Sequence, residues 1–522
     1  MIREISRRKC LRLWLCKPEY MGRTKWENRF VLLRFRKKNY MMFLKDLKRF
    51  KMERLYDKLK AYSESDFYAF HMPGHKRNKA LLGIELPYDL DITEIDGFDD
   101  LHHADGILKE EQERAARVFG AEESHFLVNG STAGILSAVM GCTHRGDKIL
   151  VARHCHKSIY HAIYMNGLVP RYVYPEFDIS MHMNGEISKE DVAKALAAEP
   201  DIKAVVIVSP NYDGVVSDVK GIAEVAHSYR IPLIVDEAHG PHFGFHPAFP
   251  GRANDLGADV VINSLHKTLP SLTQTAILHI NGKLANRRRI KKYLDMLQSS
   301  SPSYIFMASL DACVDFLDGK CEEAFELYVE RLQKFREELK PLQHLQILRT
   351  EHYDISKVVI STANANITSP ELADRLRKEY HLEMEMTGGT YVLAMTTVAD
   401  TQEGLDRLKS ALLEIDDQLE AKTAVSGSIE ISGELPRLEQ YFTPQEAAER
   451  EEDGEAEEIP WKESEGHISL EYAYLYPPGS PVIVPGERIS REAVELLCYY
   501  ETQNLQIEGI QTEGKIKVWK HE

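Results

Sequence analysis

A lysine that could bond covalently to an aldehyde lies in the segment Ser-Leu-His-Lys-Thr, at positions 264–268. A predicted strand ends directly before this segment, so Lys267 is expected at the carboxyl edge of a sheet. A lysine in such a place can be desolvated, which favours its neutral amine. A neutral amine can form a Schiff base with an aldehyde cofactor. A lone lysine after a strand is more often an ordinary surface residue, so the interpretation depends on its companions.

Asp236 is the companion that gives Lys267 a specific meaning. It ends the apolar run Ile-Pro-Leu-Ile-Val-Asp, 31 residues before the lysine. An acid at the end of an apolar strand is costly to bury unless it meets a cation. A protonated pyridine nitrogen is such a cation, and pyridoxal 5′-phosphate (PLP) needs that proton to accept electrons. The two residues together predict a PLP site, and the alternative role for Asp236 is to cap the next helix.

A phosphate site is predicted in the segment Asn-Gly-Ser-Thr-Ala-Gly at positions 129–134, between a strand and a helix. Backbone N–H groups and the positive end of the helix dipole favour an anion at such a place. The same letters also describe a simple turn and helix cap, so this motif alone is weak. The candidate phosphate contacts are Ser131, Thr132, Ala133, Ser264 and His266.

His156 is the candidate for a ring that stacks on the pyridine. It lies in the segment His-Cys-His-Lys-Ser at positions 154–158, after another apolar strand. Two histidines and a cysteine also suggest a metal site. No second cluster with ligand spacing completes a tetrahedral set, so no metal is expected. The remaining alternative is a hydrogen-bonded surface histidine.

The elements that must position these residues alternate between short apolar runs and amphipathic segments. The expected strands include 203–210, 231–239 and 259–267, with two more from 124 and 147. A helix is expected over 218–229, with Asp218 as its N-cap. This alternation predicts a doubly wound α/β domain with a mainly parallel sheet, whose ligands bind at the carboxyl ends of the strands.

The composition changes along the chain and suggests four parts. Residues 1–50 carry 16 Lys and Arg against 4 Asp and Glu, unlike the acidic remainder. We expect a basic, poorly ordered extension over 1–51, whose place in the native chain is open. A PLP-binding major domain with an N-terminal arm is expected over 52–300, a small α+β domain over 301–430 and a C-terminal α+β domain over 431–522. The acidic stretch 444–466 is expected to be a solvated helix or linker.

The overall composition excludes several classes of function. The net charge of −16 argues against nucleic acid or an anionic membrane as a partner. No apolar run is long enough for a membrane span, and no secretory signal follows the basic start. The 7 cysteines show no paired spacing, so no disulfide framework is expected. These features favour a cytoplasmic protein.

At this point the residues match a known family. The chain resembles the fold-type I PLP decarboxylases of basic amino acids, the ornithine/lysine/arginine decarboxylase family. The resemblance extends from about residue 52 to the C-terminus, and the order of the segments makes it specific. The matching segments are FHMPGHK (70–76), DDLHHADG (99–106), VNGSTAG (128–134), HCHKS (154–158), VDEAHGPHFGFHP (235–247), SLHKTLPSLTQ (264–274), SPSY (301–304) and YPPGSPVIVPGE (476–487).

The resemblance implies an aspartate aminotransferase-like fold and a role for each matched residue. Lys267 would be the Schiff-base lysine, Asp236 would pair with the pyridine nitrogen, and His156 would stack on the ring. Ala238 and His239 would lie beneath or beside the ring. The segment 301–304 would reach a neighbouring subunit, which implies a homodimer. Too few residues precede 70–76 for the wing domain of the long family members, so a short form is expected.

The resemblance implies decarboxylation of arginine, lysine or ornithine, but it does not indicate which of the three is the substrate. It also does not indicate whether the reaction serves polyamine synthesis or an acid response. A basic substrate needs an acidic contact, for which Glu487 and Glu471 are candidates; either could also be an ordinary surface residue. One alternative is another fold-type I enzyme such as an aminotransferase, because it would share Asp236 and Lys267. The other alternative is a non-catalytic protein that only holds PLP. The complete set of Lys267, Asp236 and His156 disfavours it, because a binding protein would not need an electron sink.

Overall fold

The computed structural model describes residues 54–178, 183–348, 351–421, 434–475, 479–502 and 505–520. The predicted basic extension, 1–51, lies outside the described residues, and so does the start of the segment 476–487.

The core of the larger part is a seven-stranded sheet in the order β1-β9-β8-β7-β6-β2-β3. Within this sheet only β9 runs antiparallel to its neighbours, which are β1 and β8. The prediction of a mainly parallel sheet is therefore confirmed. The strands are β1 (Glu123–Leu127), β2 (Lys148–Ala152), β3 (Val169–Val173), β6 (Val205–Val208), β7 (Leu233–Asp236), β8 (Val260–Asn263) and β9 (Ala276–Ile280).

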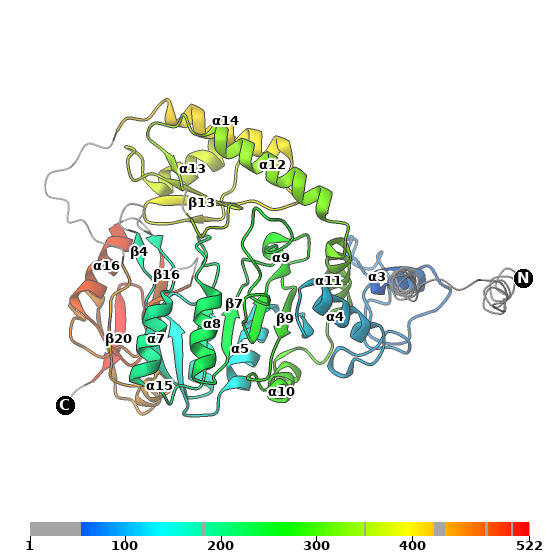
Figure 1. The fold of residues 1–522 in the computed structure, drawn as a ribbon, viewed down its shortest axis with the longest axis horizontal. Coiled ribbons are helices and arrows are strands. Elements are labelled where there is room, and N and C mark those ends of the chain that lie inside the picture. The colour runs from blue at the N-terminus through cyan, green and yellow to red at the C-terminus, as the bar shows by residue number, and fades with distance from the viewer. Residues whose placement is uncertain are drawn as a thin grey trace, which may run out of the picture. The chain divides into compact units, whose positions relative to one another are not determined.

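The three central strands form because their sequences are apolar on both faces. Every residue of β6, β7 and β8 is buried, which is typical of parallel strands covered by helices on both sides. In Figure 1, α7 and α8 lie in front of this sheet, where α8 packs on β7. The helices that cover the sheet are α5 (Gly130–Cys142), α6 (Lys157–Met165), α7 (Lys189–Ala198), α8 (Val219–Ser228) and α10 (Arg287–Leu297). The predicted N-cap of α8 is confirmed, because the Asp218 side chain accepts a hydrogen bond from Gly221 N at 2.9 Å.

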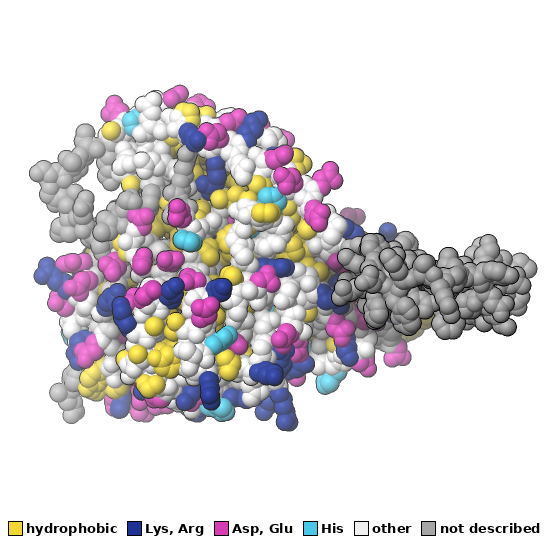
Figure 2. Space-filling model, viewed as in Figure 1, with side chains coloured by type: hydrophobic (Ala, Val, Ile, Leu, Met, Phe, Trp, Pro, Cys, Tyr) yellow, Lys and Arg dark blue, Asp and Glu magenta, His cyan; other side chains and the backbone are white. Residues whose placement is uncertain are grey.

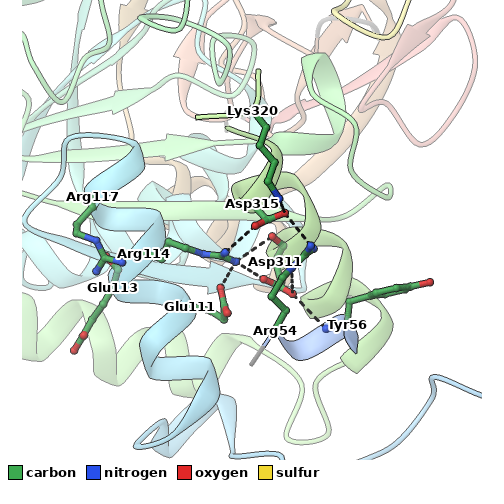
Figure 3. Close-up of polar contacts among 9 residues, drawn as sticks. All are labelled: Arg54, Tyr56, Glu111, Glu113, Arg114, Arg117, Asp311, Asp315 and Lys320. Atoms are coloured by element: carbon green, nitrogen blue, oxygen red, sulfur yellow. Dashed lines mark hydrogen bonds and ion pairs between the residues drawn. The ribbon is translucent and has the colours of Figure 1, made fainter. Parts of the chain in front are cut away.

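The N-terminal helices are joined to the major part by a buried ion cluster (Figure 3). The Arg114 guanidinium contacts Glu111 and Asp311, and its Nη1 lies 3.3 Å from Asp315 Oδ1. Arg54 Nη1 lies 2.8 Å from the other oxygen of Asp315. The cluster fixes these elements because an unpaired charge would be costly at this depth. The cluster residues lie in or next to α3 (Leu55–Ser63), α4 (Ile107–Val118) and α11 (Tyr304–Leu317), and η1 (Leu101–His103) lies between α3 and α4 in the chain.

A second sheet of four strands, in the order β10-β11-β13-β12, follows in the chain. In Figure 1 the helices α12, α13 and α14 lie beside it. The amphipathic sequence of residues 322–338 forms the long helix α12. The elements are α12 (Glu322–Glu338), β10 (Gln346–Ile347), β11 (Lys357–Ser361), α13 (Ser369–Tyr380), β12 (Met386–Thr387), β13 (Tyr391–Met395) and α14 (Gln402–Asp416).

The C-terminal part contains short strands around its own apolar cluster. The acidic stretch 444–466 contains the expected helix, α15, but it also contains β15, which pairs with β20. The expectation that this stretch is merely a solvated helix or linker is therefore corrected. The elements are β14 (Glu439–Gln440), α15 (Pro444–Glu452), β15 (Ala456–Pro460), η2 (Trp461–Glu463), β16 (Ala473–Leu475), β17 (Pro481–Ile483), β18 (Glu487–Arg488), α16 (Arg491–Thr502), β19 (Ile507–Glu508) and β20 (Lys515–Trp519).

The surface carries charges of both signs. Figure 2 shows acidic and basic side chains interspersed over the visible face of the described part. Among the residues that the structure describes, no helix combines the length and the apolar character needed to cross a membrane.

Candidate active site

The two predicted cofactor residues meet at the carboxyl edge of the seven-stranded sheet. Asp236 is the last residue of β7, and Lys267 lies in the short helix α9 (Leu265–Thr268), directly after β8. Because β7 and β8 are parallel neighbours, with Asp236 opposite Ile262, both strands end at the same edge. This is where ligands bind in open α/β sheets.

Lys267 has the environment of a reactive amine. Its Nζ lies 2.8 Å from His239 Nε2. Burial lowers the pKa of the Lys267 amine, while the negative charges of Asp236 and Glu385 oppose that change. The lowered pKa brings the neutral, nucleophilic form closer to physiological pH.

Asp236 is a buried carboxylate at the end of β7. Its side chain is almost fully buried, and its Oδ1 accepts a hydrogen bond from Ala238 N at 3.2 Å. Burial raises the pKa of the Asp236 carboxyl, although Lys267 and the Ala238 N–H act in the opposite direction. A protonated ring nitrogen at this position would supply the charge that the carboxylate needs.

The predicted phosphate site lies at the N-terminus of α5. No side chain caps this terminus, and Gly130 N donates to the carbonyl of Gln274 at 3.0 Å. An anion would therefore be bound by the N–H groups that follow Gly130. Gly130 has φ +71°, and a Cβ built there would meet no atom within 4 Å, so the space beside it is open. Ser131 Oγ lies 2.6 Å from Ser264 Oγ, which brings together two hydroxyls predicted to hold phosphate.

The other three predicted phosphate contacts do not share the direct contact that joins Ser131 to Ser264. Thr132 is exposed, and Ala133 is buried in the helix. The His266 ring makes a 2.9 Å hydrogen bond through Nδ1 to the carbonyl of Thr275, which orients the ring toward its own loop.

His156 lies at the N-terminus of α6 and faces the same region. Its Nδ1 accepts a hydrogen bond from Ser158 N at 3.2 Å and lies 2.8 Å from Ser158 Oγ. Burial and the positive charge of Lys267 lower the pKa of His156 to about 4. The imidazole is therefore neutral at physiological pH, as a ring that stacks on a pyridine should be.

These groups fit PLP on chemical grounds. The aldehyde has a partner in the Lys267 amine, the pyridine nitrogen has one in Asp236, and the phosphate has the uncapped, open N-terminus of α5. His239 lies beside the lysine, and its ring lies 4.5 Å from the ring of Tyr212.

Lys357 is a site residue that the sequence interpretation did not include. It begins β11, is fully buried, and its Nζ lies 2.8 Å from Nδ1 of His239. A signal was present in the sequence, since a lysine heads the apolar run Val-Val-Ile at 358–360. A charged residue at the head of a buried strand needs a partner, but nothing local identifies His239, 118 residues away, as that partner.

Glu487 and Glu471, the predicted substrate contacts, both have partners within the protein. Glu487 is buried, and its two oxygens each lie 2.8 Å from the Arg153 guanidinium. Glu471 accepts hydrogen bonds from the backbone N–H groups of Gln511 and Lys517, at 3.2 and 2.9 Å. This geometry favours structural roles for both carboxylates.

Comparison with known proteins places the chain in one family. Residues 53–409 match the family described as "Orn/Lys/Arg decarboxylase, major domain", and residues 433–514 match its "C-terminal domain". The chain is 34% identical to an arginine decarboxylase of Bacillus subtilis over 471 residues, which cover 87% of this chain and 95% of that protein. It is 25% identical to a lysine decarboxylase of Pseudomonas aeruginosa over 552 residues, which cover 83% and 73%.

The fold agrees with these sequence matches. The crystal structure of a Francisella novicida lysine decarboxylase has a TM-score of 0.77 to this chain at 20% identity, covering 92% of this chain and 84% of that one. The predicted fold-type I architecture and the predicted family are thereby confirmed. The chain belongs to the Orn/Lys/Arg decarboxylase family, whose members are PLP-dependent enzymes that decarboxylate basic amino acids.

Proposed function

We propose that the chain decarboxylates arginine to agmatine and CO₂, with PLP held on Lys267. The observation that carries the proposal is the meeting of the Lys267 amine, the buried Asp236 carboxylate and His239 at one edge of the sheet. Family membership establishes the reaction class, and the choice of substrate and of residues is the proposal.

The choice of arginine rests on the relatives. Arginine decarboxylases of Bacillus subtilis and Bacillus anthracis are 34% and 32% identical to the chain, and the matches cover 95% and 97% of their lengths. The Escherichia coli constitutive lysine decarboxylase is 24% identical, and the match covers 75% of it. Both the identity and the shared length favour arginine over lysine.

The protein's own residues would bind and orient the reactants. Lys267 would hold the cofactor, Asp236 would keep the ring nitrogen protonated, and Ser131 and Ser264 would hold the phosphate with the N-terminus of α5. His156 would cover the ring as a neutral imidazole. When bound, PLP supplies an electron sink for the pair released as the carboxylate leaves.

Glu385 is the carboxylate that we propose for the substrate's basic end. It is exposed, it precedes β12, and its negative charge acts on the Lys267 amine. Its Oε1 accepts a hydrogen bond from the Tyr212 hydroxyl, which orients it. A guanidinium favours a planar, bidentate contact with such a carboxylate.

We also propose that the enzyme works as a homodimer in the cytoplasm. The segment 67–86 exposes large apolar side chains, and Phe70 is 90% exposed. Such a concentration of apolar surface is typical of an interface, and a second copy is the partner implied by the resemblance. A cytoplasmic location is supported by the described cysteines, because Cys142, Cys155, Cys313, Cys321 and Cys498 are all free.

The predicted domain boundaries are kept as a proposal. The strands of the seven-stranded sheet lie within 52–300, those of the four-stranded sheet within 301–430, and β14 to β20 within 431–522. The two family matches also separate between residues 409 and 433, close to the proposed C-terminal boundary.

In the test, the purified, PLP-loaded enzyme is incubated separately with arginine, with lysine and with ornithine. The CO₂ released and the amine formed are measured in each case. The proposal predicts agmatine from arginine, with kcat/KM at least about tenfold above the other two, a difference of about 1.4 kcal/mol in transition-state binding. Cadaverine or putrescine as the main product would refute the choice of arginine. Formation of 2-oxo acids without CO₂ would favour an aminotransferase.

The role of Glu385 has its own test. Glu385→Gln is expected to raise KM for arginine, because the amide cannot form the ion pair, and to leave the binding of PLP unchanged. Glu383→Gln is a matched control, since Glu383 is also an exposed acid in the same loop. Equal kinetics for the two variants would exclude Glu385 as the substrate contact.

A further inference from the structure

A chain of three nitrogen-bearing side chains, two of them buried, links the two sheets of the protein. Lys267 Nζ lies 2.8 Å from Nε2 of His239, and Lys357 Nζ lies 2.8 Å from Nδ1 of the same ring. Lys267 follows β8 of the large sheet, whereas Lys357 begins β11 of the small sheet. Both ring nitrogens of His239 are therefore occupied by lysines.

The number of protons in this chain is restricted by hydrogen-bond chemistry. A lysine ammonium can only donate, and a neutral imidazole has one N–H and one acceptor nitrogen. Burial, followed by the positive charges of Lys267 and Lys357, lowers the pKa of His239 well below its usual value, so its ring is neutral. The lysine that faces the ring N–H must then accept as a neutral amine. The other lysine donates to the bare ring nitrogen, and it can do so as an ammonium.

When the chain carries one ammonium, two arrangements are possible, and one proton relay converts one into the other. In the first, Lys267 is the ammonium and His239 donates from Nδ1 to a neutral Lys357. If Lys267 gives its proton to Nε2 while Nδ1 gives its proton to Lys357, then Lys357 becomes the ammonium and Lys267 the neutral amine. No proton is exchanged with solvent, and the total charge is unchanged.

Lys357 is held rigidly enough for this role. Its side chain is fully buried, and it passes beside Gly214, where a Cβ would lie 2.7 Å from Lys357 Cγ. Gly214 has φ +106°, so glycine is needed there for backbone and packing reasons. Burial lowers the pKa of the Lys357 amine to about 8, which allows it to carry or release a proton near physiological pH.

Charged groups from several elements surround Lys267, His239 and Lys357. Lys357 is influenced by the carboxylates of Asp354, Glu385 and Asp213 and by the charge of Lys267. Asp354 already pairs with His242, at 3.1 Å. Lys267 is influenced by Asp236 and Glu385, and the ring of His239 by the nearby His156 and His266.

We propose that Lys357 is a positioning residue that takes up, through His239, the proton that Lys267 must lose before its amine can bond to the cofactor. The inference rests on the proposed role of Lys267. It assigns a function to a lysine of the small sheet that has no assigned contact with the cofactor.

The test measures the pKa of the Lys267 amine in the apoprotein. Competitive acetylation over a range of pH, read by mass spectrometry at the Lys267 peptide, gives the midpoint directly. Lys357→Met is expected to raise this midpoint by about one pH unit, because Lys267 can then keep its proton and donate to His239. Lys357→Arg keeps a permanent donor to Nδ1, so its midpoint should stay at or below that of the wild type.

A second readout is the rate at which added PLP forms its imine absorbance. Lys357→Met is expected to slow this rate about tenfold near pH 7, and the defect should disappear above the pKa of Lys267. A defect of equal size at every pH would show a structural role and overturn the inference. Lys409→Met is the control, since Lys409 lies in α14 and pairs with Glu338.

The remaining outcomes are also decisive. If Lys357→Met does not fold, His239→Gln interrupts the same relay and should raise the same midpoint. If the acetylation midpoint of Lys267 is unchanged in every one of these variants that folds, the inference is overturned and the proposed function is left intact. If PLP still bonds covalently to Lys267→Ala, the proposed function itself fails.

Discussion

Replacing Glu487 by glutamine should destabilise the protein rather than weaken substrate binding. The Glu487 carboxylate receives two 2.8 Å hydrogen bonds from Arg153, at the carboxyl end of β2, and one of 2.8 Å from Val484 N. The side chains of Arg153 and Glu487 are 0% and 1% exposed. The pair joins the large sheet to the C-terminal part, so its loss should destabilise both.

The magnitude follows from the burial of the pair. Removing one partner of a buried ion pair costs about 3–5 kcal/mol, because the other charge is left uncompensated. For a protein of this size, about 2 °C of Tm per kcal/mol gives a fall of about 6–10 °C. The guanidinium also lies 4.7 Å from the ring centroid of Tyr172, and that contact would remain in the variant.

Thermal unfolding followed by circular dichroism, together with KM for arginine, is the appropriate assay. Combining Arg153→Met with Glu487→Leu removes both charges and should recover part of the lost Tm, since a buried pair can be replaced by apolar residues at little cost. A Tm within about 2 °C of the wild type, with a strongly raised KM, would refute the structural role. It would instead support the substrate contact suggested by the sequence.

Three further predictions concern the site and its surroundings. Asp236→Asn should lower kcat for arginine about 100- to 1,000-fold in steady-state kinetics, because an amide cannot hold the ring nitrogen protonated; an unchanged kcat would contradict its role. Gly214→Ala should lose about 1–3 kcal/mol in thermal unfolding, because its Cβ would lie 2.7 Å from Lys357 Cγ at φ +106°, and wild-type stability would contradict that packing. Burial raises the pKa of Glu237 to about 8, so the stability that it contributes is present below about pH 4.3 and is lost as the pH rises through 8. Between pH 5 and 8.5, the Tm of Glu237→Gln should therefore fall less than the Tm of the wild type. Parallel curves of Tm against pH for the two proteins would exclude this explanation.

The sequence was most informative where the signal is local. The strands β6, β7 and β8 were predicted because each is an uninterrupted apolar run, and the helix after β6 was predicted from its capping aspartate. The antiparallel direction of β9 could not be predicted, because the letters Ala-Ile-Leu-His-Ile at 276–280 do not encode the direction in which a strand runs. The partly exposed strand β15 was missed because its pairing with β20, rather than its composition, holds it in place.

The site shows the same division. Asp236 ends one apolar strand, and Ser264 and Lys267 follow the next within a few residues. Strand ends and residue types were therefore enough to group them. Lys357 was missed because its place beside His239 depends on how the small sheet packs on the large one. The partner of Glu487 was missed for a similar reason, since 334 residues separate it from Arg153.

The most direct test of the account is to locate the covalent bond to PLP. The PLP-bound enzyme would be reduced with borohydride, digested and analysed by mass spectrometry, so that the pyridoxyl group is assigned to one lysine. The proposed site chemistry predicts the adduct on Lys267 and an unmodified Lys357. An adduct on Lys357 would contradict it, because the two amines lie on opposite sides of His239 and their proposed roles would be reversed.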